Sequence, residues 1–260
     1  MVRCDLLVLV VVFGASAWAR SEDPVNNDGS VKALIIQGGK LISQGKPAEA
    51  LKAYEKACGL EPGNEKAVIG QYISLVKLNR QDDGAKVLQK WVQAKSDDPR
   101  RWLCKGMAEA QTGRPENALE SFEKLILLQP QEGANWVGKG QVLSALKRDQ
   151  EALNAFDKAI SLSPKHNGAW FSRGGVLLRI GKYDEAIKSL DKAIELSPKW
   201  AETWYDRACA YSLKGDKVKA ITDLRKAIEL KPSLKAHAST DPDFKRLREE
   251  SEFKNLVKST

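Results

Sequence analysis

The sequence has little of the residues that bind metals or form disulfides. It contains two histidines and four cysteines in 260 residues. They are His166, His237, Cys4, Cys58, Cys104 and Cys209. The cysteines form no C-x-x-C pair, and neither histidine has a second ligand at zinc-binding spacing. We therefore predict no metal site and no disulfide framework, and we interpret the cysteines as small buried apolar side chains.

Catalytic motifs are also missing. The sequence has no phosphate-binding glycine loop, no H-E-x-x-H, no G-x-S-x-G and no Cys–His arrangement. Acidic residues such as Asp184 and Glu185 stand at predicted helix starts, where they favour the helix dipole. We predict no enzymatic activity, no catalytic residues and no cofactor.

Long apolar runs are confined to the N-terminus. Arg3 precedes the apolar run Leu6–Phe13, and small residues with an A-x-A cleavage signal ending at Ala19 follow. This order is typical of a secretory signal peptide, and the run is shorter than the roughly 20 residues of a membrane span. We predict a signal peptide at 1–19, a flexible lead-in at 20–30 and export to the periplasm or the extracellular space. The alternatives are an uncleaved membrane anchor and a start codon assigned too far upstream.

Acidic residues are fewer than basic ones, and the formal net charge is +8. The hydrophobic content of 42% is ordinary for a folded protein and argues against disorder. A basic balance can indicate an anionic partner, but a lysine-rich solvated surface explains it more often. Nucleic acid is therefore disfavoured as a partner.

What the sequence does contain is a 34-residue period. Tryptophans recur at this step, and so do prolines, alanines and bulky apolar residues. The positions are Trp102, Trp136, Trp170 and Trp204; Pro130, Pro164, Pro198 and Pro232; Ala118, Ala152, Ala186 and Ala220; and Phe122, Phe156, Leu190 and Leu224. Four residue types on one period indicate a tandem repeat.

Each repeat predicts two helices. Trp170, Gly174 and Leu177 lie at i, i+4 and i+7, which is one face of a first helix. A turn at Gly181 precedes a second helix with the same spacing, and Pro198 ends it because proline lacks the amide donor. We expect the small residues to let the two helices approach closely, and the buried tryptophans to fill the remaining space.

The pattern Trp-x-x-x-Gly, then Ala-x-x-x-Phe/Leu-x-x-Ala, then Pro, resembles the tetratricopeptide repeat (TPR) family. The resemblance implies an all-α fold, a right-handed solenoid of about six helix-turn-helix hairpins. Repeats are expected near 31–64, 65–98, 99–132, 133–166, 167–200 and 201–234. The second repeat fits poorly, since Tyr72 occupies a small-residue position and Gly84 and Trp91 occupy alanine positions. We expect a distorted or longer second helix there.

The pattern changes after Pro232. Residues 235–260 are amphipathic, with Phe244 and Phe253 among charged residues. The resemblance implies a C-terminal capping helix over this segment, which the last repeat of an array needs because it has no neighbour. A free amphipathic helix that binds a partner is the alternative.

The resemblance also implies a concave groove, lined by the first helix of each hairpin, that holds a partner segment. Groove positions begin one residue after the tryptophan position and recur four residues later. The predicted groove residues are Leu103, Met107, Val137, Gln141, Phe171 and Tyr205. In the first two repeats the equivalent residues are Ile35, Gly39, Ile69 and Ile73. The alternative is that these side chains pack against the next hairpin.

The apolar content of the groove positions favours a protein or peptide partner with apolar side chains. Family members that bind the acidic C-termini of chaperones have lysine and then asparagine at these positions, and Ile35 and Gly39 are neither. We therefore predict a non-enzymatic protein-binding scaffold or adaptor, without that specific function. A self-associating structural array, a homo-oligomer, is one alternative.

A basic column recurs three residues after each tryptophan. Its members are Lys105, Lys139, Arg173 and Arg207. One interpretation is structural, because aliphatic stems cover the indoles and the cations face the rings. The other is that the column binds an anionic polymer or an acidic partner, in which case binding would weaken steeply with salt.

Overall fold

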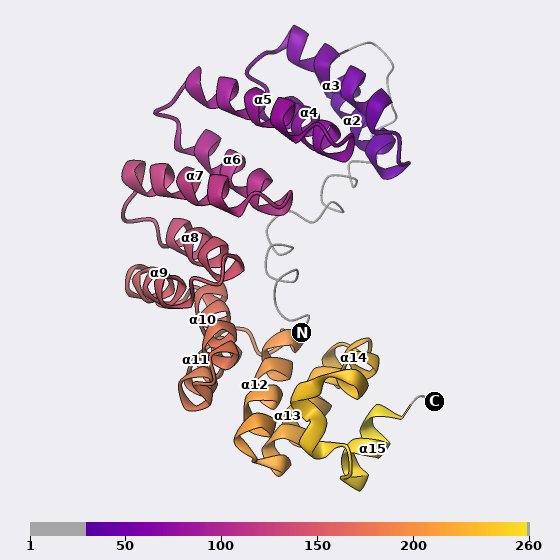
Figure 1. The fold of residues 1–260 in the computed structure, drawn as a ribbon, viewed down its shortest axis with the longest axis vertical. Coiled ribbons are helices and arrows are strands. Elements are labelled where there is room, and N and C mark those ends of the chain that lie inside the picture. The colour runs from indigo at the N-terminus through magenta and orange to yellow at the C-terminus, as the bar shows by residue number, and fades with distance from the viewer. Residues whose placement is uncertain (1–29, 259–260) are drawn as a thin grey trace. The chain divides into compact units, whose positions relative to one another are not determined.

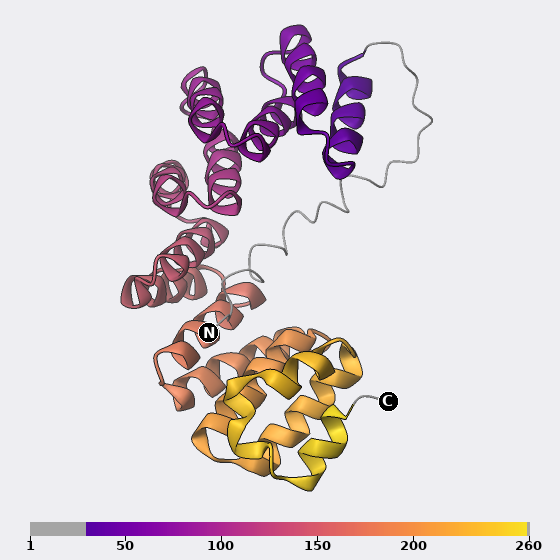
Figure 2. The same ribbon diagram turned by 45° about the vertical axis from the view of Figure 1, so that its right-hand side comes forward.

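The computed structural model describes residues 30–258, and Figures 1 and 2 show these residues as ribbons. The expected signal peptide at 1–19 and nearly all of the lead-in at 20–30 lie outside the described residues. The chain divides into two compact units, Met1–Gln131 and Glu132–Thr260, and each is described by itself. Within the described residues every regular element is a helix, so the predicted all-α fold is confirmed.

Unit 1 consists of three helical hairpins. Its helices are α2 (Val31–Ser43), α3 (Pro47–Leu60), α4 (Glu65–Lys77), α5 (Gln81–Gln93), α6 (Pro99–Gln111) and α7 (Pro115–Leu128). The helices pack in the pairs α2–α3, α4–α5 and α6–α7. The first helices of the hairpins, α2, α4 and α6, also pack side by side.

Unit 2 contains three more hairpins and a C-terminal segment. Its hairpin helices are α8 (Gly133–Ala145), α9 (Asp149–Leu162), α10 (Asn167–Arg179), α11 (Tyr183–Leu196), α12 (Ala201–Lys214) and α13 (Lys217–Leu230). The C-terminal segment consists of α14 (Leu234–Thr240), the 3₁₀ helix η2 (Pro242–Leu247) and α15 (Ser251–Val257). The hairpin pairs are α8–α9, α10–α11 and α12–α13.

The C-terminal segment differs from the expected single capping helix. It forms three short helices, because Asp241 is extended and Pro242 cannot donate a backbone hydrogen bond. Phe244, Leu247 and Phe253 are nonetheless fully or almost fully buried, and η2 packs against α12 while α15 packs against α13. The segment thus covers the last hairpin.

Each hairpin turns at one residue in the left-handed backbone region. These residues are Gly45, Asn79, Gly113, Lys147, Gly181 and Gly215, and their φ angles lie between 59° and 96°. The spacing between them is 34 residues throughout. A side chain with a Cβ is disfavoured in this region, although asparagine tolerates it better than most residues, so Lys147, at φ 61°, holds a strained conformation that glycine holds in four of the other hairpins and Asn79 in the fifth.

Close approach of the two helices depends on glycine in the first helix. A Cβ added to Gly140 would lie 2.6 Å from Phe156 Cε1, and one added to Gly174 would lie 2.7 Å from Leu190 Cγ. In the second repeat the sizes are exchanged. The ring of Tyr72 on α4 is fully buried and lies against Gly84 on α5, where a Cβ would be 2.9 Å from Tyr72 Cδ2.

The second repeat is distorted at its exit, and its second helix is shorter, not longer, than the other second helices. In the other repeats the residue before the proline caps the second helix in a non-helical conformation, as at Glu61 and Ser197. Ser96 takes the place of that proline, and the helix α5 ends earlier with Ala94 still in helical geometry. Helix α5 has 13 residues where the other second helices have 14, so the longer helix that we considered does not form.

The periodic tryptophans are less buried than the sequence predicts. Trp102 is buried, but Trp136, Trp170 and Trp204 are half-buried. The indole Nε1 donates to a backbone carbonyl six residues earlier: Trp170 to Pro164 at 2.8 Å and Trp204 to Pro198 at 2.9 Å. Trp102 makes the equivalent bond to Ser96 O at 2.7 Å, so the loop carbonyl satisfies the indole N–H whether the ring is buried or half-buried.

The turn geometry predicts opposite effects for two substitutions. Lys147→Gly relieves the strained turn and should raise the free energy of unfolding by about 1 kcal/mol, since glycine tolerates this region. Gly113→Lys should lower it by a similar amount, although a Cβ at Gly113 meets no atom within 4 Å. Urea unfolding followed by circular dichroism measures both. If both substitutions changed the free energy of unfolding equally and in the same direction, backbone strain at these turns would not explain the effect.

Candidate binding surface

In unit 1 the predicted groove positions form an apolar row that is half-exposed. Leu103 and Met107 lie on α6 and are half-buried. Ile35 on α2 and Ile69 and Ile73 on α4 occupy the equivalent positions and are also half-buried. Because α2, α4 and α6 pack side by side, these five residues share one face, which we term the apolar row.

In unit 2 the large groove residues are covered by the chain itself. Val137, Phe171 and Tyr205 are each 6% exposed, whereas Gln141 is half-buried. The ring of Trp200, just before α12, lies on Phe171 with a centroid separation of 4.4 Å. Trp200 lies outside the 34-residue set of tryptophans, and the period therefore does not predict this contact.

Tyr205 is held by the C-terminal segment. Its hydroxyl donates a hydrogen bond to Asp241 Oδ2 at 2.8 Å, and its ring meets Phe244 edge-on at 5.5 Å and His237 at 5.4 Å. Burial raises the pKa of Tyr205 far above its ordinary value, so the hydroxyl remains a donor. Phe171 and Tyr205 therefore pack against following elements, as in the alternative interpretation, and their role in binding stays a prediction.

The two arginines of the basic column join neighbouring hairpins. Arg207 on α12 contacts Asp191 Oδ1 on α11 at 2.6 Å and binds Asp223 on α13 through Nε and Nη2 at 2.7 and 2.8 Å. Arg173 on α10 contacts Asp157 Oδ1 on α9 and Ser189 Oγ on α11, both at 2.7 Å. The partners stand 16 residues before and after each arginine.

The two lysines of the column lie over their tryptophans. The Lys105 Nζ is 5.8 Å from the Trp102 ring centroid, and the Lys139 Nζ is 5.9 Å from that of Trp136. Arg207 lies over Trp204 at 4.9 Å. These contacts match the structural interpretation of the column. Binding of an anionic polymer through it stays a prediction.

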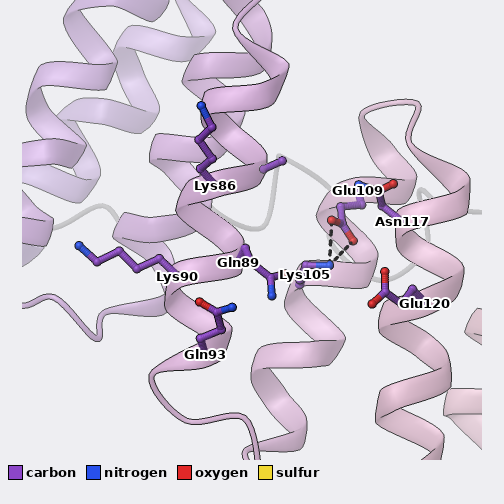
Figure 3. A pocket seen from close by; sticks show the side chains of 9 residues that line it. Lys86, Gln89, Lys90, Gln93, Lys105, Glu109, Asn117 and Glu120 are labelled. Carbon is purple, nitrogen blue, oxygen red and sulfur yellow. Dashed lines mark hydrogen bonds and ion pairs between the residues drawn. The ribbon is translucent and has the colours of Figure 1, made fainter.

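A polar pocket of about 370 Å³ opens between α5, α6 and α7. Figure 3 shows Gln89 and Gln93 from α5 on one side, Asn117 and Glu120 from α7 on the other, and Lys105 with Glu109 from α6 between them. No pattern in the sequence predicts this pocket.

The charges at the base of this pocket are matched within the chain. The Lys105 Nζ lies 3.0 Å from Glu109 Oε1 and 2.9 Å from Ser121 Oγ, and Lys105 and Glu109 are 4% and 1% exposed. At this interface Gln89 stands 16 residues before Lys105, where Arg173 and Arg207 have aspartates. Lys105 therefore binds within its own hairpin, to Glu109 and Ser121.

The three cysteines of the described residues, Cys58, Cys104 and Cys209, form no disulfide with one another. Burial raises the pKa of Cys58 to about 11 and that of Cys104 to about 12, and nearby glutamates add to both shifts. Thiols that stay protonated are poor nucleophiles and poor metal ligands. Within residues 30–258 no group of three His, Cys, Asp or Glu side chains could hold a metal ion. None of the helices in this range has the length and apolar character needed to cross a membrane.

Three family models, each described as a tetratricopeptide repeat, match the chain at residues 35–139, 150–199 and 201–234. Together they span more than half of the chain. No curated protein sequence matches it.

Solved structures share the fold at low sequence identity. A chain of the APC/C hetero-tetramer Cut9-Hcn1 matches with a TM-score of 0.57 and 20% identity, over 86% of this chain and 43% of that chain. MamA 41-end from Desulfovibrio magneticus RS-1 matches with a TM-score of 0.53 and 20% identity, over 79% and 97%. YrrB, a TPR protein with an unusual peptide-binding site, matches with a TM-score of 0.50 and 24% identity, over 70% and 94%.

The buried ion pair at the pocket predicts a test by substitution. Glu109→Ala leaves Lys105 buried without its carboxylate and should lower the free energy of unfolding by about 3–5 kcal/mol. The double variant Lys105→Met with Glu109→Leu removes both charges and should be far less destabilised. Urea unfolding of the two variants measures this. If Glu109→Ala has the same urea midpoint as the wild type, the ion pair does not contribute to stability.

Thiol burial predicts slow alkylation. At pH 8 iodoacetamide should modify Cys58 and Cys104 at least about a hundredfold more slowly in the folded chain than in urea, where the thiol pKa is near 8.5. The pKa of each thiol is higher in the folded chain than in the unfolded chain. The thiols therefore contribute stability below about pH 9, and this stability is lost as pH rises towards 11–12. Mass spectrometry of timed samples measures the rates, and equal rates in both states would contradict the assigned burial.

Proposed function

We propose, from the premise that the chain belongs to the tetratricopeptide repeat family, that it is a scaffold or adaptor which binds a partner protein segment along the first helices of its hairpins. Proteins of this family are typically non-enzymatic and bind proteins or peptides. The array presents repeated first helices, and a segment that spans several of them meets a repeated set of side chains.

One observation carries the proposal, namely the apolar row of unit 1. Ile35, Ile69, Ile73, Leu103 and Met107 are half-buried on three adjacent helices. Contiguous apolar side chains that remain partly exposed mark interaction surfaces, because water contact with them is unfavourable. In unit 2 the large residues at the equivalent positions are covered by Trp200 and by the C-terminal segment, so we place partner binding on unit 1.

The proposal has a direct test. The variant Ile73→Arg with Met107→Arg places two charges in the apolar row and should reduce capture of partner proteins from native extract at least about tenfold. The matched control is Leu60→Arg with Leu127→Arg, because these leucines are 58% and 73% exposed on second helices of the same unit. Quantitative mass spectrometry measures capture, and thermal melting checks that both variants are folded.

Two outcomes would contradict the proposal. One is a row variant that is folded and still captures every partner, and the other is an equal loss of capture in the control. The salt dependence of binding distinguishes the alternative function from the proposed one. Affinity for an anionic polymer would fall steeply between low and moderate salt if that polymer bound through the basic column, Lys105, Lys139, Arg173 and Arg207. The self-associating array predicts an elution volume in size-exclusion chromatography that changes with concentration.

We also propose that the protein is exported. The support is the order of basic residue, apolar run and cleavage signal over residues 1–19. An uncleaved segment that anchors the chain in a membrane remains the alternative. N-terminal sequencing of the protein from its native source distinguishes the two, because cleavage would leave Arg20 as the first residue.

A further inference from the structure

The polar pocket of unit 1 lies on the face of α6 opposite the apolar row. Lys105 and Glu109 at its base stand two residues after Leu103 and Met107, which is about 200° around a helix. The volume of about 370 Å³ falls within the range of roughly 300–1,000 Å³ that is usual for ligand sites. The pocket is therefore a surface separate from the row, and partner contact with the row leaves it open.

Glu109 replaces a residue of the apolar core. The equivalent positions carry leucine in four other repeats, Leu41, Leu75, Leu143 and Leu177. Apolar side chains of similar volume are often as stabilising as a buried ion pair or more so, and packing alone therefore favours leucine at this position. The third repeat instead keeps Glu109 and Lys105 buried beneath an open pocket, with Ser121 bonded to both. This exchange gives the pocket a polar floor.

The interface between α5 and α6 lacks an ion pair that unit 2 has. In unit 2 Arg207 binds Asp191 on the preceding second helix. Gln89 stands at the position of that aspartate and extends from α5 towards Lys105 (Figure 3). Because Lys105 binds Glu109 and a serine of its own hairpin, its ammonium forms no bond with α5. The pocket lies at this unbridged place.

Amide side chains line the walls of the pocket. Gln89 and Gln93 stand four residues apart on α5, and Asn117 lies on the other wall, on α7 (Figure 3). Within residues 30–258 these three side-chain amides make no hydrogen bond. Each amide has an N–H donor group and an acceptor oxygen. A ligand that matches them must carry donors and acceptors together.

The charges around the pocket do not favour an ionic ligand. The ion pair at the base is neutral as a whole, and Lys86 on the rim lies 3.8 Å from Asp83. Lys90 extends away from the base, whereas Glu120 extends towards it from α7 (Figure 3). All of the lining residues except Ala85 are polar, so an apolar ligand is disfavoured as well.

We propose that this pocket is a second binding site, which takes amide groups of a polar, uncharged peptide segment through Gln89, Gln93 and Asn117. The amides come from asparagine or glutamine side chains or from the peptide backbone, because both carry an N–H donor and a carbonyl acceptor. The site goes beyond the proposed function, since it does not involve the apolar row. It places a polar contact of unit 1 on the other side of α6.

Selection from a random peptide library tests the proposal. The full chain is immobilised, and peptides that also bind Gln89→Ala with Gln93→Ala are discarded. We expect the retained peptides to be polar and uncharged. Their affinity should be at least about tenfold lower for this variant, because the hydrogen bonds to two amides are lost. Asn117→Ala, on the other wall, should weaken the same peptides.

Changes in the peptides distinguish the two sources of the amide. Alanine in place of the peptide's asparagine or glutamine lowers the affinity if side chains are bound. N-methylation of its peptide bonds lowers the affinity if the backbone is bound. Peptides that tolerate both changes would overturn the proposal, and so would retained peptides that are mainly charged or apolar.

Two control variants locate the binding. The glutamine variant should fold, since both glutamines are exposed and alanine has the highest helix propensity. Its matched control, Gln150→Ala with Asn154→Ala, removes two exposed amides four residues apart on α9 and should leave the affinity unchanged. The row variant, Ile73→Arg with Met107→Arg, should also bind the retained peptides as the wild type does.

An equal loss of affinity in either control would overturn the proposed site. Retention of no peptide would overturn it too, including the case in which the pocket binds a saccharide instead. Each of these results leaves the proposed function standing, because that function is tested by capture of partner proteins through the apolar row.

Discussion

The structure depends on a contact that recurs along the array, in which a bulky side chain of the second helix packs against a glycine of the first. Phe156 lies against Gly140 and Leu190 against Gly174, at distances that exclude a Cβ. Each contact fixes how closely two helices pack, and its repetition every 34 residues places the first helices of a unit side by side. In the second repeat Tyr72 and Gly84 reverse the sizes and preserve the volume, which is the kind of exchange that cores tolerate.

Similar hairpins nonetheless present different surfaces. In unit 1 the row around Ile73 and Leu103 stays half-exposed, whereas in unit 2 Trp200 and the C-terminal segment cover the corresponding aromatics. The scaffold is thus uniform in backbone and specialised in its side chains. Function in such a protein resides in the residues that the repeat does not constrain.

The sequence predicts the hairpins well, because glycine, proline and helical spacing act over a few residues and the period repeats their signal. It predicts the binding surface poorly. The cover on Phe171 comes from Trp200, which breaks the period, and that on Tyr205 comes from residues more than 30 positions later. The half-buried Trp170 was also missed, because its size predicts a core position while its indole N–H bonds to the loop carbonyl of Pro164. The contacts that cover Phe171 and Tyr205 join different elements, and no local pattern encodes them, whereas the Trp170 bond is local but cannot be inferred from side-chain size.

The bonds of Arg173 and Arg207 to neighbouring hairpins in unit 2 limit how such an array can be rearranged. Arg207 is bound by an aspartate of the preceding hairpin and by another of its own, whereas Arg173 has an aspartate before it and a serine after it. A duplicated or transplanted hairpin that lost its predecessor would leave a largely buried guanidinium with part of its charge unmatched. These ion pairs therefore constrain the order of the hairpins. Gene rearrangement or protein engineering must move each arginine together with the aspartate that it binds in the preceding hairpin.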